Sequence, residues 1–78
     1  MIEKSLKLII TFPTTTAAIA MEKICLSNKL PGRLIPLPRE IDSGCGMAWC
    51  SSPEKSKKLE QIAKEEGIEI SGIYQLFI

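Results

Sequence analysis

Histidine is absent from this chain of 78 residues. Its absence excludes Ser-His-Asp and Cys-His catalysis, and it removes a ligand found in most catalytic zinc sites. Any chemistry must come from cysteine, carboxylates, cationic side chains, hydroxyls or backbone groups. A self-contained thiol enzyme is the least favoured interpretation, because nothing supplies a general base and so short a chain has little room for a deep pocket.

The chain also lacks an excess of either charge. Ten Lys and Arg against nine Asp and Glu leave a net charge of +1, which gives no electrostatic argument for nucleic acid or membrane as a partner. The apolar run at 6–12 contains Lys7 and is followed by no small-residue cleavage site, so it predicts a strand, not a signal peptide. We therefore expect a cytoplasmic protein whose three cysteines are reduced thiols.

Residues 1–78 are expected to form a single domain, because no linker interrupts them. Apolar periodicity and end signals predict six segments: a strand at 5–12, a helix from about 15 to 28, strands at 33–38 and 47–51, a helix from about 53 to 66, and a strand at 68–78. This βαββαβ order predicts an α+β, ferredoxin-like fold: a four-stranded antiparallel sheet with two helices on one face. Pro36 lacks the N–H of a central strand, so the second strand is expected at a sheet edge.

Two of the three cysteines are predicted to be packing residues. Cys25 lies on the apolar stripe of the first helix, and buried free cysteine packs like a small hydrophobe. Cys50 shares a strand face with Ala48, opposite Trp49, and packing is favoured over a role as a secondary thiol. No metal site is expected, because a three-cysteine zinc site would require Cys25 to leave the core.

Cys45 differs from the other two, because it stands between Gly44 and Gly46, whose lack of side chains leaves it unshielded. Glycine permits positive φ, and successive backbone N–H groups in such turns can stabilise a thiolate. Arg39, six residues earlier, is a cation that would lower the pKa of the thiol. By itself the motif leaves two interpretations open: a functional thiol, or a hairpin loop that tolerates cysteine.

The stretches ITFPTTTAAIAMEK and GRLIPLPREIDSGCGMA together resemble the DUF3343 family of selenium and sulfur carrier-like proteins. The specific part is PLPREIDSGCG, in which Pro-x-Pro-Arg precedes the Gly-Cys-Gly turn at a fixed spacing. The likeness covers nearly the whole chain. The matching positions are Phe12, Pro13, Thr14, Glu22, Pro36, Pro38, Arg39, Ser43, Gly44, Cys45 and Gly46.

The resemblance implies a carrier, in which Cys45 holds sulfur or selenium as a persulfide or selenium adduct and passes it to an acceptor enzyme. Arg39, Ser43 and the backbone N–H groups of Gly44 and Gly46 would stabilise the thiolate and the carried atom. No cofactor is implied beyond that covalently carried atom. The implied partners are donor and acceptor enzymes. A homodimer through the exposed edge of the second strand also stays open, although the prolines of that strand oppose such pairing.

The alternative is a non-catalytic module of ferredoxin-like fold that binds a small molecule or a protein. Such a module would use an exposed sheet face, which Trp49, Tyr74 and Phe77 could furnish. The two functions differ in their dependence on Cys45, because only the carrier requires its thiol.

Overall fold

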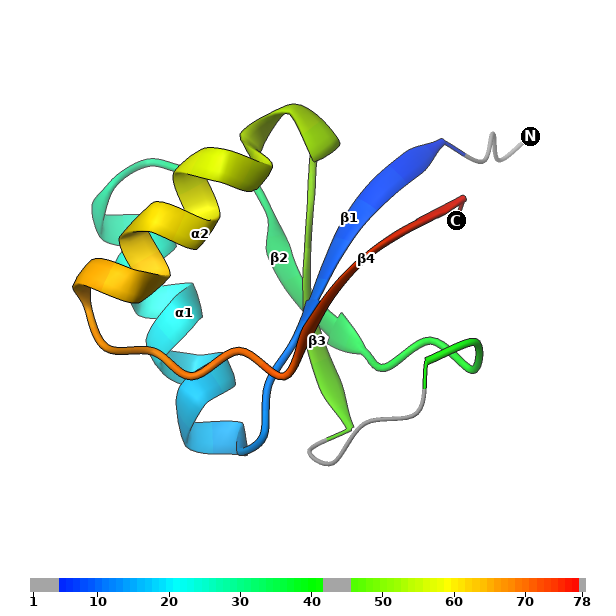
Figure 1. Ribbon diagram of the computed structural model, residues 1–78, viewed down its shortest axis with the longest axis horizontal. Helices are drawn as coiled ribbons and strands as arrows, with labels where there is room; N and C mark the ends of the chain where they lie inside the picture. Colours follow the sequence, from blue (N-terminus) through cyan, green and yellow to red (C-terminus); the bar gives the residue numbers. More distant parts are fainter. Residues whose placement is uncertain (1–4, 42–45, 78) are drawn as a thin grey trace.

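The computed structural model describes residues 5–41 and 46–77, and its element order is βαββαβ. The elements are β1 (Leu6–Thr11), α1 (Thr15–Ser27), β2 (Arg33–Pro36), β3 (Met47–Ser51), a short 3-10 helix η1 (Pro53–Lys55), α2 (Ser56–Glu65) and β4 (Gly72–Phe77). The strands form one antiparallel sheet in the order β2-β3-β1-β4, and both helices cover the same face (Figure 1). The predicted α+β, ferredoxin-like fold is confirmed, as is the edge position of β2.

The helices begin and end at residues suited to those places. Thr14 precedes α1, and its hydroxyl oxygen accepts a hydrogen bond from the backbone N–H of Ala17 at 3.1 Å, which satisfies one of the free N–H groups of the first turn. Asn28 ends α1 and donates from its side chain to the carbonyl of Ile24 at 2.8 Å. After α2 the chain turns at Gly67, whose φ of 70° is in the left-handed region typical of a helix-ending glycine.

The main core lies between the helices and the sheet. It combines alternate residues of the central strands with one stripe of each helix, as the periodicities of 2 and 3.6 require. Its buried members are Leu8, Ile10, Phe12, Ala18, Met21, Cys25, Trp49, Leu59, Ile62 and Ala63.

A second apolar cluster lies on the opposite face of the sheet. Its buried members are Ile9, Ile41, Ala48 and Cys50. The chain after β2 contributes to it: the N–H of Ile41 donates to the carbonyl of Pro38 at 3.0 Å, closing a turn, and Ile41 is only 5% exposed. This segment lies on the side of the sheet that faces away from the helices (Figure 1). The sheet is therefore covered on both faces near its centre.

The last strand differs from the prediction. It was expected from residue 68, but β4 begins at Gly72. Ile68 and Ile70 lie in the preceding loop and contact the main core from there. The alternating apolar residues Ile68 and Ile70 therefore mark two contacts of a loop with the core and not the start of a strand. Pairing with β1 starts only at Gly72, opposite Thr11.

Candidate functional site

Cys25 is fully buried in the main core and is not a reactive thiol. Its side chain is 0% exposed, on the sheet-facing stripe of α1 with Met21. Burial raises the pKa of Cys25 to about 11, because the apolar surroundings disfavour the thiolate. The thiolate is the nucleophile, so burial and the raised pKa both disfavour reaction of this thiol at neutral pH. The predicted packing role of Cys25 is confirmed.

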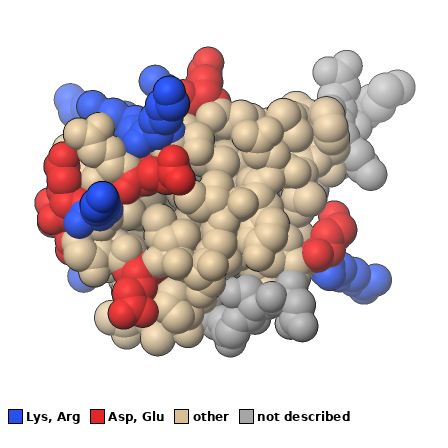
Figure 2. All heavy atoms as spheres, in the orientation of Figure 1, with Lys and Arg blue, Asp and Glu red and all other residues tan. Residues whose placement is uncertain are grey.

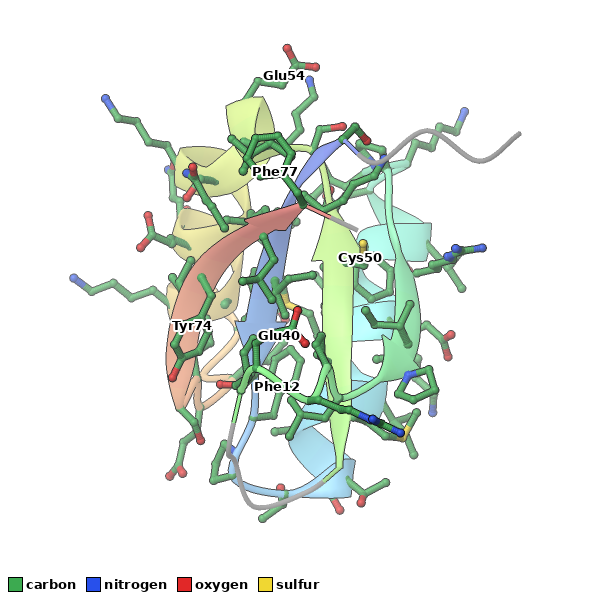
Figure 3. All side chains as sticks on the ribbon, turned by 90° about the vertical axis from the view of Figure 1, so that its right-hand side faces the viewer. Phe12, Glu40, Cys50, Glu54, Tyr74 and Phe77 are labelled. Carbon is green, nitrogen blue, oxygen red and sulfur yellow. The ribbon has the colours of Figure 1, made fainter. Side chains whose placement is uncertain are left out.

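Cys50 lies on the other side of the sheet, near the end of β3. Its neighbours in register are Ile9 on β1 and Arg33 on β2, and it is 9% exposed. Figure 3 shows its sulfur on the face turned away from the helices. The sheet separates this thiol from Cys25, so the two cannot belong to one metal site. Cys50 is mainly a packing residue, as predicted, and it retains a small exposed surface.

The proposed carrier thiol lies in the connection between β2 and β3. Cys45, with Ser43 and Gly44, is outside the described residues. The described residues on either side are fixed: Ile41 is buried against the sheet, and the carbonyl of Gly46 accepts from the N–H of Leu37 at 2.9 Å.

Gly46 is exposed and has a φ of 76°, which is the positive φ that the Gly-Cys-Gly sequence predicted for a glycine. It lies four residues before Cys50, with the extended strand β3 between them, which corresponds to about 13 Å. The thiol of Cys50 is thus at the far end of β3 from the carrier motif.

Arg39 occupies the turn that leads to Ile41. It follows Pro38, whose carbonyl accepts the bond that closes the turn, and its side chain is exposed. Glu40, the next residue, is also exposed, and Figure 3 places it on the open side of the sheet. Arg39 is therefore an exposed cation on the connection that carries Cys45. Its predicted role toward that thiol stays a prediction.

The aromatic residues do not make one exposed face. Trp49 is 1% exposed in the main core, so its predicted place on an exposed surface is wrong: β3 is central, and its helix-facing side is covered. Tyr74 and Phe77 are 41% and 65% exposed on the edge strand β4. Their pairing with Ile9 and Leu6 puts them on opposite faces of that strand.

One cluster near Cys50 was missed by the sequence reasoning. Lys7 from β1 and Arg33 from β2 line a hollow of about 290 Å³ together with Cys50. The two cations are 26 residues apart in sequence, and only the order β2-β3-β1 brings them to either side of β3. The sequence offered one signal for this cluster: Lys7 lies within the apolar strand β1, so its side chain was expected on one face of the sheet.

Comparison with protein families gives a match over residues 7–75, to the family described as "Putative Se/S carrier protein-like". The chain belongs to this family. The match spans α1, β2, the Gly-Cys-Gly segment and most of β4, so membership in the Se/S carrier-like family rests on nearly the whole fold. No curated protein and no solved structure matches the chain. Within the described residues, no helix is long and apolar enough to cross a membrane.

Proposed function

We propose that this protein carries sulfur or selenium on Cys45 as a persulfide or a selenium adduct and delivers it to an acceptor enzyme. The observation that carries the proposal is the family match, taken together with the state of the other two thiols. Cys25 is buried with a raised pKa, and Cys50 is nine-tenths buried. A carrier thiol must be reached by two partners in turn, and neither of these meets that requirement.

The chemistry is thiol exchange and needs no histidine. The thiolate of Cys45 attacks the outer sulfur of a donor persulfide, R–S–SH. A bond forms between Cys45 and that sulfur as the donor S–S bond breaks, and the donor leaves as the thiolate R–S⁻. Delivery is the same exchange, in which an acceptor thiolate takes the outer sulfur and Cys45 leaves as a thiolate. No net oxidation occurs in either step.

In this proposal the thiolate of Cys45 and the atom that it carries are stabilised by Arg39 and by the backbone N–H groups of Gly44 and Gly46. Ser43 adds a hydrogen bond. Support comes from Arg39 being exposed on the same connection, and from the positive φ of Gly46. A cation near a thiol lowers its pKa, and so raises the thiolate fraction at neutral pH.

The test is adduct formation on the full chain, measured as a gain of one sulfur atom by intact mass and peptide mapping after incubation with glutathione persulfide. We expect Cys45→Ser to lose the adduct. Cys50→Ser is the matched control and should retain it, as should Cys25→Ala. Equal labelling of all three variants, each shown to be folded by circular dichroism, would contradict the carrier function.

A second candidate, binding of another protein, is favoured by β4. The strand is at the sheet edge, has the sequence GIYQLF without a charged residue, and exposes Ile73, Tyr74 and Phe77. Figure 2 shows most of the charged side chains on the side of the helices, and a largely uncharged surface where Figure 1 has β4. An uncharged edge is a template for pairing with another strand, and we propose a second copy of this chain as its partner.

A further inference from the structure

The hollow beside Cys50 differs chemically from the others on the described surface. We call it the Cys50 hollow; it is lined by Lys7, Pro31, Gly32, Arg33, Cys50, Ser51 and Ser52. Two of these side chains are cations and, among the described residues, none that lines it is acidic. The described residues that line it therefore carry a charge of +2 beside a thiol, in a protein whose net charge is only +1.

The other two hollows have acidic residues in their linings and lack this excess of positive charge. The one between the helices is lined by both Lys58 and Glu65, and the Glu65 carboxylate accepts a hydrogen bond from Gln61 at 3.2 Å. The one at the start of α1 includes Glu66 and Glu69, whose charges oppose an anion at that helix end. Of these three hollows on the described surface, only the Cys50 hollow has a lining that favours an anion.

The sheet register explains how the cations converge. Arg33 is directly opposite Cys50 across the β2–β3 pairing, and such pairs have Cβ atoms about 5 Å apart. Lys7 is two residues from Ile9, the other partner of Cys50, so it lies diagonally on the same face at about 7–8 Å. Lys7 and Arg33 therefore flank the thiol from the strands on either side of β3.

The rim of the hollow is held in place by a partly buried hydrogen bond. The hydroxyl of Ser51 donates to the carbonyl of Pro31 at 2.7 Å, and Ser51 is 5% exposed. This bond ties the end of β3 to the chain that enters β2. The backbone positions of Arg33 and Cys50 are thus fixed by strand pairing and by this contact.

We propose that the Cys50 hollow binds a small oxyanion of sulfur or selenium, held between Lys7 and Arg33 with the Cys50 sulfur beside it. A guanidinium donates a fork of N–H groups that fits two oxygens of an oxyanion, and an ammonium adds a mobile charge. About 290 Å³ is at the small end of ligand pockets, which suits an ion rather than a nucleotide. The assignment to sulfur or selenium rests on the proposed carrier function.

The experiment measures alkylation of Cys50 by two reagents of equal size class, anionic iodoacetate and neutral iodoacetamide. Both reagents react with the thiolate of Cys50, so its fraction cancels in the ratio of the two rates. A change of this ratio between variants therefore reports a change of the charge around the thiol. Cys45→Ser serves as the background, because Cys45 and Cys50 share the tryptic peptide 40–55. The measurement is therefore independent of whether Cys45 is a carrier.

At low ionic strength we expect Lys7→Gln and Arg33→Gln each to lower the iodoacetate-to-iodoacetamide ratio several-fold, since each removes a cation from the hollow. Lys23→Gln, an exposed cation on α1, is the control and should leave the ratio unchanged. An equal ratio in all four proteins overturns the proposal.

Sulfate, selenate and phosphate, none of which reacts with iodoacetamide, are then tested for saturable protection of Cys50 against that reagent, with the amide NMR signals of Ser51 and Ser52 as a second readout. Protection and shifts by sulfate or selenate, lost in the Lys7→Gln and Arg33→Gln double variant, support the proposal. Protection by phosphate at the same or lower concentration overturns the sulfur and selenium assignment. Absence of saturation with all three ions overturns the site itself.

Discussion

Gly32 lies directly against the indole ring of Trp49. A Cβ atom at residue 32 would be 2.7 Å from Trp49 Cε2 and Nε1, and 2.7 Å from the carbonyl oxygen of Cys50. The φ of Gly32 is 135°, in the region that side chains disfavour. The glycine therefore allows the chain between α1 and β2 to close over a tryptophan that is 1% exposed.

Gly32→Ala is expected to lower the free energy of unfolding by about 2–4 kcal/mol, because it adds a steric overlap with backbone and ring to an unfavourable φ. Urea denaturation followed by tryptophan fluorescence measures the change. Gly67→Ala is the matched control: its φ is also positive, at 70°, but a Cβ there meets nothing within 4 Å. Gly67→Ala should lower the free energy of unfolding by about 1 kcal/mol, because only its φ is unfavourable. Equal losses in the two variants would contradict the close contact.

The buried thiol of Cys25 predicts a loss of stability in alkaline solution. Its pKa rises from 9.0 to about 11 on burial, so the unfolded chain releases the proton at lower pH than the folded protein. The free energy of unfolding should fall as pH rises from about 9 to 11, by about 2 kcal/mol through this group. The measurement is urea denaturation at half-unit pH intervals.

Lysines also titrate in that range, so the Cys25 contribution is taken as the difference between wild type and Cys25→Ala. The free energies of unfolding of wild type and Cys25→Ala should converge as the pH rises above 9. Cys50→Ala should keep the wild-type decrease of this free energy with pH. If the profiles of wild type and Cys25→Ala run parallel from pH 8 to 11, the assignment is wrong.

A charge on β4 is expected to suppress self-association. Phe77 is 65% exposed on the edge strand, so Phe77→Lys should change monomer stability by less than about 0.5 kcal/mol while placing a cation on that edge. Leu26→Lys is the control, since Leu26 is 69% exposed but lies on α1. Sedimentation velocity over a concentration series should show association of wild type and Leu26→Lys, and a monomeric Phe77→Lys. A wild-type protein that stays monomeric throughout would exclude the proposed dimer.

Much of the fold could be predicted because local patterns and topology agree. Pro36 alone predicted the edge position of β2, and the apolar periodicity at about 53–66 predicted α2, whose buried residues are Leu59, Ile62 and Ala63. These features depend on single residues or on one element. They are visible before any long-range contact is known.

Other features depend on contacts that no local pattern encodes. Ile41 stands among polar residues, yet it covers the sheet face opposite the helices, because the turn that begins at Pro38 directs it there. Lys7 and Arg33 each look like ordinary surface cations until the strand order puts them on either side of Cys50. The predicted role of Cys45 came from its motif and its family resemblance, and it stays a prediction.

The position of the sheet between Cys25 and Cys50 has a consequence for the protein under oxidising conditions. A disulfide requires Cα atoms no more than about 7 Å apart and side chains directed toward each other, whereas these two side chains point to opposite faces. The native fold therefore forbids a Cys25–Cys50 disulfide. A chain recovered with that bond must have lost its native structure before it was oxidised, so the crosslink records unfolding until a reductant cleaves it.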